Sequence, residues 1–342
     1  MLQELQKVTE VPLDLERSAH PTFVRARWVT PKEYSQIILL SAIVLRMMFE
    51  KLAMTICAVG AIGLCMGRPA AAEAAPSVFA GTLADMTYPE LEEATRSGAV
   101  ALWALGVIEE HGPHLPLATD VYVPTAQLLQ VQHRLAEKKI NSVIVPPYYW
   151  GVNRVTGSFP GSIDIRPEVM TELMTDVFRS LAKAGFRQVF CITGHYDAAH
   201  SRAIIDAVRR ANRALDIKVR YVVPKPLAER VGLKAGDAGF IIVDAPVEAA
   251  PAHPDLHAGE AETSMLLSIA PDVVRTEIIP SLAPTDLMPK DVETWRKGYE
   301  QARKVTPRGY LGDPASANAA SGSIRIERQA AAFADAIAAS VR

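Results

Sequence analysis

The chain has 342 residues, of which 36 are basic and 38 acidic, so its formal net charge is −2 with neutral histidines. This length is enough for a large hydrophobic core in one domain or in two small ones. No basic patch or acidic tail stands out, so nothing in the composition points to a nucleic acid partner.

An apolar segment near the N-terminus has the pattern of an export signal. Lys51 precedes the apolar run of residues 53–66, and Ala72-Glu73-Ala74 follows it. A basic start, a short apolar core and an A-x-A site are typical of a secretory signal peptide. We therefore expect residues 47–74 to be a signal peptide and the protein to be periplasmic or secreted.

The same region has an alternative interpretation. A membrane anchor over residues 37–66 would also be apolar, but charged residues interrupt it and the uninterrupted run is short for a bilayer. Residues 1–46 lie upstream of the expected signal peptide, which indicates a true start at Met47 or Met48. Cleavage would leave residues 75–342 as the mature domain.

Beyond residue 80, short apolar runs alternate with helical patterns. The apolar runs predict strands at residues 100–105, 142–145, 188–192 and 218–223. The helical spacing predicts helices at residues 124–136, 167–184 and 198–215. In the second of these helices, the residues expected to face the core are Val169, Leu173, Val177 and Leu181. This alternation implies an α/β fold, with a mostly parallel sheet covered by helices on both faces.

The first predicted strand leads into a stretch rich in possible metal ligands. This stretch contains Glu109, Glu110, His111, His114 and Asp120. Its glycine and prolines prevent a helix from starting inside it, so we expect a loop at the carboxyl end of the strand. Open α/β sheets bind their ligands at that edge. Mixed imidazole and carboxylate ligands suit zinc, manganese or iron, whereas a solvated polar loop is the alternative interpretation.

Two further clusters carry similar residue types. Gly194-His195-Tyr196-Asp197 follows the third predicted strand, and the segment from His257 to Ser264 opens a predicted helix. Neighbouring parallel strands present their carboxyl ends at one edge, so the first two clusters can meet there. The histidines that fall within the three clusters are His111, His114, His195 and His257. Each has a carboxylate nearby in the sequence, which favours a metal site over isolated structural histidines.

These motifs together resemble the creatininase family of metal-dependent amidohydrolases. The resemblance rests first on Glu109-x-His111-Gly112-Pro113-His114-Leu115-Pro116 with Thr119-Asp120. The segments Gly194–Asp197 and His257–Ser264 are similar to the second and third motifs of that family. The resemblance covers residues 79 to 342. It implies a three-layer α/β/α sandwich with a mostly parallel sheet, usually assembled as a homo-oligomer of six chains.

The resemblance also implies a site for two divalent ions per chain, Zn²⁺ or Mn²⁺, with Fe²⁺ also compatible. Glu109, Asp120 and His195 would hold one ion. His111, Asp120 and Asp197 would hold the other, with Asp120 bridging the two. Creatinine-hydrolysing members have Glu in place of Asp197. Because Asp is one methylene shorter, we expect the second ion to be held more weakly or through water.

Other departures from the family concern the substrate. Many members carry a Glu-His pair in the loop before Phe159-Pro160-Gly161, where this chain has Val155-Thr156. This difference argues against creatinine as the substrate. We expect Trp150 either to line the pocket or to pack in the core. Glu110 stands where the family usually has Gln, and we expect it either to orient a ligand or to face solvent.

The expected chemistry uses both ions and two further side chains. Two ions about 3.5–4 Å apart would lower the pKa of a bridging water, and the resulting metal-bridging hydroxide would attack the amide carbonyl. We expect His257 to donate a proton to the leaving nitrogen. Glu262 would orient His257 or carry protons itself, and a helix-surface carboxylate is the alternative for Glu262.

The sequence therefore predicts an exported metal-dependent hydrolase. Its expected reaction is cleavage of a carbon–nitrogen bond, other than a peptide bond, in a small or cyclic amide. The expected partner is this small molecule, with no nucleic acid and no stable membrane partner. A lactonase or deformylase using the same dinuclear site is one alternative. A periplasmic binding protein that keeps its metals without turnover is the other.

Overall fold

The computed structural model describes residues 77, 79–244 and 253–341. At its centre lies a five-stranded sheet in which every pair of neighbouring strands is parallel. Its strands are β1 (Val100–Leu105), β2 (Ser142–Tyr148), β3 (Gln188–Thr193), β4 (Lys218–Pro224) and β5 (Phe240–Val243). They follow the order β2-β1-β3-β4-β5 across the sheet. The predicted parallel sheet is confirmed.

The expected upstream extension (1–46), the signal peptide (47–74) and its cleavage site lie outside the described residues. The division of the chain at these positions and the export of the protein therefore stay predictions. Where the structure describes the chain, it contains no helix with both the length and the apolar character needed to cross a membrane.

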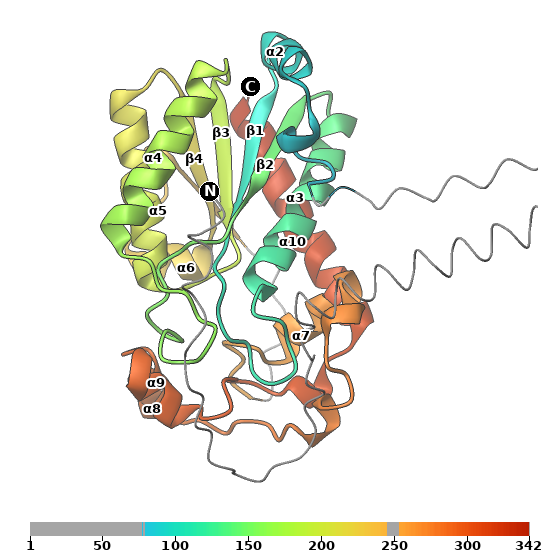
Figure 1. Cartoon of the computed structure of the whole chain (residues 1–342), viewed down its shortest axis with the longest axis vertical. Helices are drawn as coiled ribbons and strands as arrows, with labels where there is room; N and C mark the ends of the chain where they lie inside the picture. The colour runs from blue at the N-terminus through green and yellow to red at the C-terminus, as the bar shows by residue number, and fades with distance from the viewer. Residues whose placement is uncertain (1–76, 78, 245–252, 342) are drawn as a thin grey trace, which may run out of the picture. The chain divides into compact units, whose positions relative to one another are not determined.

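Helices cover both faces of the sheet, as Figure 1 shows. The helices are α2 (Tyr88–Arg96), α3 (Thr119–Glu137), α4 (Pro167–Lys183), α5 (Ala198–Ala214), α6 (Lys225–Val231), α7 (Glu260–Ile269), α8 (Pro289–Trp295), α9 (Tyr299–Val305) and α10 (Ala319–Val341). Helices α4 and α5 pack on one face of the sheet, and α3 and α10 pack on the other. This arrangement confirms the predicted three-layer α/β/α sandwich.

Strand β1 shows why helices must pack on both faces of the sheet. All of its residues are buried, and their side chains alternate between the two hydrophobic cores. Trp103 belongs to the core under α4 and α5, where its ring meets Phe178 edge-on at a centroid distance of 5.4 Å. Leu102 belongs to the core under α3 and α10. A continuous apolar run is the pattern expected of a parallel strand buried on both sides.

Helix α4 begins at Pro167 as predicted, but the face that it turns to the core differs from the prediction. Its buried residues are Met170, Met174, Thr175, Phe178 and Leu181. Val169 and Leu173 are 38% and 43% exposed, so their predicted burial is wrong. Two apolar stripes with the same four-residue spacing run along this helix, and the one that contains Phe178 packs against the sheet.

Helix α3 begins earlier than its sequence pattern predicts. The expected first residue was Pro124, but the helix starts at Thr119 and contains Pro124 in its interior. Proline lacks an N–H, so the carbonyl of Asp120 four residues earlier has no donor at that position. Asp120 therefore lies in the first turn of a helix rather than on the predicted loop.

Strand β2 is longer than predicted because it continues through Pro146 and Pro147 to Tyr148. Prolines cannot donate to a neighbouring strand, and they are tolerated here because β2 lies at the edge of the sheet. The prediction ended the strand at these prolines, as would be correct for a central strand.

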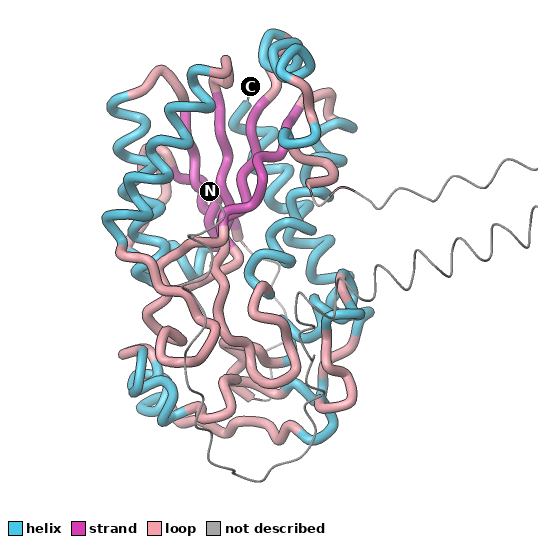
Figure 2. Tube along the Cα trace, viewed as in Figure 1, coloured by secondary structure: helices cyan, strands magenta, loops and turns pink. Residues whose placement is uncertain are grey.

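The strand order creates a crevice between β1 and β3. The chain leaves β1 for β2 on one side, returns to β3 on the other side of β1, and continues outward to β4. Open α/β sheets bind ligands at such a reversal, beyond the carboxyl ends of the strands. Leu105 and Thr193 are register partners, so the two ligand-rich motifs leave the sheet side by side. Figure 2 shows the loops gathered beyond this edge.

Candidate metal centre and active site

Two glycines allow the first helical turn of α3 to approach the strand ends. A Cβ atom on Gly106 would overlap the carbonyl oxygen of Asp120. A Cβ atom on Gly194 would lie 2.7 Å from the same oxygen. Real Cβ atoms do not come this close to backbone atoms. Glycine at the ends of β1 and β3 therefore lets Asp120 sit between the two strands.

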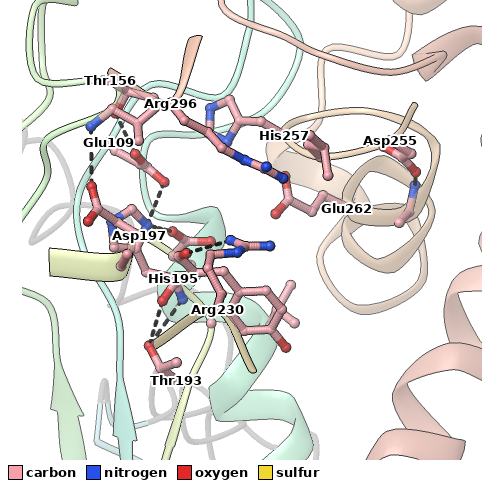
Figure 3. A pocket seen from close by; sticks show the side chains of 18 of the residues that line it. Glu109, Thr156, Thr193, His195, Asp197, Arg230, Asp255, His257, Glu262 and Arg296 are labelled. Atoms are coloured by element: carbon pink, nitrogen blue, oxygen red, sulfur yellow. Dashed lines mark hydrogen bonds and ion pairs between the residues drawn. The ribbon is translucent and has the colours of Figure 1, made fainter. Parts of the chain in front are cut away.

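The structure brings Glu109, Asp120 and His195 together. His195 Nδ1 lies 2.9 Å from Glu109 Oε1 and 2.9 Å from Asp120 Oδ2. All three residues are buried, and their ligand atoms are close enough to bind one metal ion. Figure 3 shows Glu109 and His195 converging from different segments. This group is the set expected for the first ion.

A second group forms around His111. Its Nε2 lies 3.4 Å from Asp120 Oδ1 and 3.7 Å from Glu262 Oε2. Its Nδ1 lies 3.2 Å from the backbone oxygen of Glu109, so an Nδ1–H that donates there leaves the Nε2 lone pair facing the carboxylates. Among the described residues this Nε2 has no hydrogen-bond partner although it is buried. His111, Asp120 and Glu262 can hold one ion.

Asp197 is placed differently from its expected role. Its Oδ1 caps α5 by accepting a hydrogen bond from Ala199 N at 2.6 Å, and its Oδ2 accepts one from Arg154 N at 2.9 Å. Both carboxylate oxygens are thus engaged with backbone amides. Asp197 belongs to none of the possible metal-binding groups in the described part of the chain, and Glu262 supplies the carboxylate of the second group.

The charges at this centre fit divalent cations. Glu109 and Asp120 are 2% and 3% exposed, and buried carboxylates need a cation or several hydrogen bonds nearby. Burial and His257 oppose protonation of His111, but the carboxylates of Asp120 and Glu262 raise its pKa to about 8. Burial has the opposite effect on a carboxyl group and raises the pKa of Glu262. Buried imidazole and carboxylate ligands are a suitable donor set for zinc or manganese.

Thr156 forms a hydrogen bond to Glu109, which belongs to the first group of possible metal ligands. Its hydroxyl donates to Glu109 Oε2, and it also lies 2.7 Å from Asn153 Oδ1. The side chain is buried. The sequence marked this position only as a departure from the family. In the structure, Thr156 fixes the orientation of Glu109.

We expect the Thr156→Val variant to bind metal about 10–100-fold more weakly, because hydrogen bonds from outside the ligand set orient the ligands themselves. Titration of metal-free protein with Mn²⁺ would measure this change. Thr171→Val, on α4 and away from the centre, is the matched control. An unchanged affinity in folded Thr156→Val protein would contradict the positioning role.

His257 is held beside the two groups by backbone and side-chain contacts. It pairs with Leu311 in an antiparallel bridge, and its Nε2 lies 2.8 Å from the backbone oxygen of Glu110. Its ring lies 4.5 Å from that of His111. Burial opposes protonation, but the hydrogen bond to Glu110 and the nearby carboxylates raise the pKa of His257 to about 10. His257 can therefore hold a proton, and together with Glu109 and His111 it can also ligate a metal.

Glu110 orients His257 rather than facing solvent. It is 7% exposed, and its Oε1 lies 3.4 Å from His257 Nε2. Its Oε2 accepts a hydrogen bond from Gly112 N at 3.0 Å. The sequence allowed Glu110 either to orient a ligand or to face solvent, and its burial excludes the second role.

His114 has a structural position. It is fully buried, and its Nε2 lies 2.8 Å from Thr263 Oγ1 in α7. Burial and the neighbouring imidazoles lower the pKa of His114 to about 4. A neutral ring in this position links the first motif to the third without joining any of the metal-binding groups in the described chain.

A cavity of about 540 Å³ opens onto the centre. Glu109, Asp120, His195, His257 and Glu262 all line it. Trp150 does not line it and does not pack in the core, because its side chain is 43% exposed beside Tyr149. Two aromatic residues line the cavity, Tyr196 and Trp295, and the ring of Trp295 lies 6.0 Å from that of His257. Sequence reasoning missed Trp295 because no motif surrounds it.

Comparison with known proteins agrees with this geometry. Residues 84–337 match the family model described as creatininase, creatinine amidohydrolase. The chain is 33% identical over 245 residues to a mycofactocin precursor peptide peptidase of Mycobacterium ulcerans, covering 68% of this chain and 84% of that protein. It is 28% identical over 278 residues to a creatinine amidohydrolase of Pseudomonas putida, covering 76% of this chain and 96% of that protein.

Solved structures share the fold. A crystal structure of creatinine amidohydrolase superposes with a TM-score of 0.59 at 23% identity, covering 76% of this chain and 98% of that one. A manganese form of creatininase and a variant of Zn-Zn type superpose with TM-scores of 0.58 and 0.57. Both are 22% identical to this chain, with the same coverage.

Proposed function

Because this chain belongs to the creatininase family, we propose that it is a metal-dependent hydrolase that cleaves the carbon–nitrogen bond of a small or cyclic amide. The observation that carries this proposal is the convergence of Glu109, Asp120 and His195 with the unpartnered Nε2 of His111 at one buried centre. Such a donor set is suited to divalent cations.

We propose two ions per chain. Glu109, Asp120 and His195 would hold one, and His111, Asp120 and Glu262 would hold the other. When bound, the ions would supply an activated water as nucleophile and polarise the amide carbonyl. Glu262 replaces the expected Asp197 in this proposal, because both carboxylate oxygens of Asp197 already accept backbone hydrogen bonds.

His257 would supply the proton that the leaving nitrogen needs. Its ring faces the cavity and is oriented by Glu110, whose carboxylate and backbone oxygen both contact His257 Nε2. The hydrogen bond to Glu110, which is outside the proposed ligand set, favours the protonated imidazole. Hydrolysis of an amide requires such a donor because the amine is a poor leaving group until it is protonated.

A peptide amide is the second candidate substrate. The relative from M. ulcerans is named a peptide peptidase, and it is more similar in sequence to this chain than the P. putida enzyme named for creatinine. The cavity also has room for a ligand larger than a single small ring, since ligand pockets of about 300–1,000 Å³ accommodate drug-sized molecules.

The test is release of amine or of carboxylate from a substrate panel, since lactones release only the carboxylate. Cyclic amides, N-acyl amino acids, dipeptides, formamides and lactones would be incubated with the protein after chelation and after addition of Mn²⁺ or Zn²⁺. We expect metal-dependent release of amine from amides. Turnover confined to lactones or formamides would favour the lactonase or deformylase alternative. Binding without turnover of any compound would favour the binding-protein alternative.

A further inference from the structure

Several arginine residues line the cavity. Those that line it without forming an ion pair to any carboxylate in the described chain are Arg154, Arg202, Arg230 and Arg296. They come from separate segments, since Arg202 lies on α5, Arg230 on α6 and Arg296 directly after α8. The cavity therefore presents several guanidinium groups that form no ion pair with a carboxylate in the part of the chain that the structure describes.

Arg230 and Arg296 both reach into the cavity. Figure 3 shows both side chains extending toward the space between His195 and Glu262. Arg230 Nη1 donates to the backbone oxygen of Tyr196 at 3.1 Å. Burial, and then the neighbouring charge of Arg296, lower the pKa of Arg230, and the smaller effects of Tyr196 and Asp197 do not offset them. Two like charges thus face the same cavity, an arrangement that an anion between them would relieve.

Within the described residues, no acidic residue of the cavity forms an ion pair with either arginine. Asp197 directs both oxygens to backbone amides, as described above. Glu262 Oε2 accepts a hydrogen bond from Ala258 N at 2.6 Å and faces His111. Asp255 accepts a hydrogen bond from Ala261 N at 2.8 Å. The carboxylates are thus occupied by other groups, and the two guanidinium groups remain available to a ligand.

We propose that Arg230 and Arg296 form an anion-binding subsite, and that the substrate is an amide that also carries a carboxylate. This inference rests on the proposed amide hydrolysis. The planar guanidinium matches a carboxylate with paired, charge-assisted hydrogen bonds. The subsite and the metal centre line one cavity, so a single molecule can occupy both. Arg154 and Arg202 also line the cavity, and their positive charges attract the same ligand.

Paired probes that differ only in this charge test the proposal. N-acetyl amino acids and their carboxamides would be titrated into Mn²⁺-loaded protein by calorimetry. We expect the acids to bind about 10–100-fold more tightly, which is the usual worth of a charged hydrogen bond. The Arg230→Gln and Arg296→Gln variants should each reduce this preference, and the double variant should abolish it. Arg210→Gln, which alters an exposed arginine of α5 outside the cavity, should keep it.

Several results would overturn the subsite. Equal affinity for acids and carboxamides would do so. A preference for acids that survives in the double variant would also do so, because the metal ions alone would then account for binding of the carboxylate. A phosphonate probe that binds more than tenfold more tightly than its carboxylate counterpart would replace the carboxylate assignment. Because the side chain of Arg296 forms no hydrogen bond within the described residues, and its backbone N–H at the end of α8 is unaffected by the substitution, Arg296→Gln provides a variant expected to fold normally.

The same probes separate this proposal from the proposed function. Amine release would be measured beside affinity on each pair. An acid preference that depends on the arginines, without release of amine from any probe, would keep the subsite and remove the hydrolase. Release of amine at equal rates and affinities from acids and carboxamides would keep the hydrolase and remove the subsite.

Discussion

The His257→Ala variant is expected to keep its metal and to lose turnover by about 10²–10⁴-fold, the usual contribution of a positioned acid or base. The reason is that His257 lies beside the metal centre, against His111, while Glu110 holds its Nε2. Removing the ring leaves Glu109, Asp120 and His195 in place, so the loss should affect proton transfer more than metal binding.

The chemistry of the leaving group sharpens this prediction. Anilides with electron-withdrawing substituents need the proton less than alkyl amides do, so the His257→Ala variant should lose less activity on them. The surface residue His133 offers a matched control, because its side chain is 78% exposed on α3. His133→Ala should behave like the unmodified protein.

Metal analysis of the same variant tests whether His257 is a metal ligand instead of a proton donor. His257 can join Glu109 and His111 as a ligand. Loss of metal in His257→Ala would make it a ligand and would leave the proton donor unidentified. Full metal with unchanged turnover would remove His257 from the mechanism.

Substitution of His195 or His111 is expected to lower turnover about as much as His257→Ala does. The cause differs, because these substitutions remove a metal ligand. His195→Ala should lose the first ion, because its Nδ1 lies 2.9 Å from carboxylate oxygens of both Glu109 and Asp120. His111→Ala should lose the second ion for the corresponding reason. Elemental analysis of each purified variant would measure the occupancy. Full occupancy in both variants would show that the ligand assignment is wrong.

A pair of carboxylate variants decides between the two assignments for the second ion. Glu262→Gln should lower the metal content toward one ion per chain, because Glu262 completes the group with His111 and Asp120. Asp197→Ala should retain both ions and instead lower stability, since the Asp197 side chain caps α5. Loss of an N-cap typically costs about 1 kcal/mol. The opposite pattern of metal loss would restore Asp197 as the ligand.

The local sequence pattern was sufficient to locate the metal-binding motifs. Val100–Leu105 is apolar throughout and is followed by glycine, so both the strand and the position of the ligands beyond its end could be predicted. Parallel strands present their carboxyl ends at one edge, so the meeting of the first two motifs beyond β1 and β3 could also be predicted. These features depend on a few consecutive residues, and this is why the sequence alone indicated them.

Features that depend on tertiary contacts could not be obtained in this way. The two apolar stripes of α4 have the same spacing, and only packing against Trp103 selects the one containing Phe178. Glu262 becomes a candidate ligand because α7 lies against the first motif, a contact that no spacing in the sequence indicates. Arg230 and Arg296 follow no motif, and they meet only because α6 and α8 flank the same cavity.

Removal and restoration of metal test the central claim most directly. The purified protein would be stripped with a chelator, assayed on the amide that it cleaves best, and then titrated with Mn²⁺ or Zn²⁺ while metal content and amine release are followed together. We expect amine release to disappear with the metal and to return as occupancy approaches two ions per chain. Full activity in protein without metal would contradict the account.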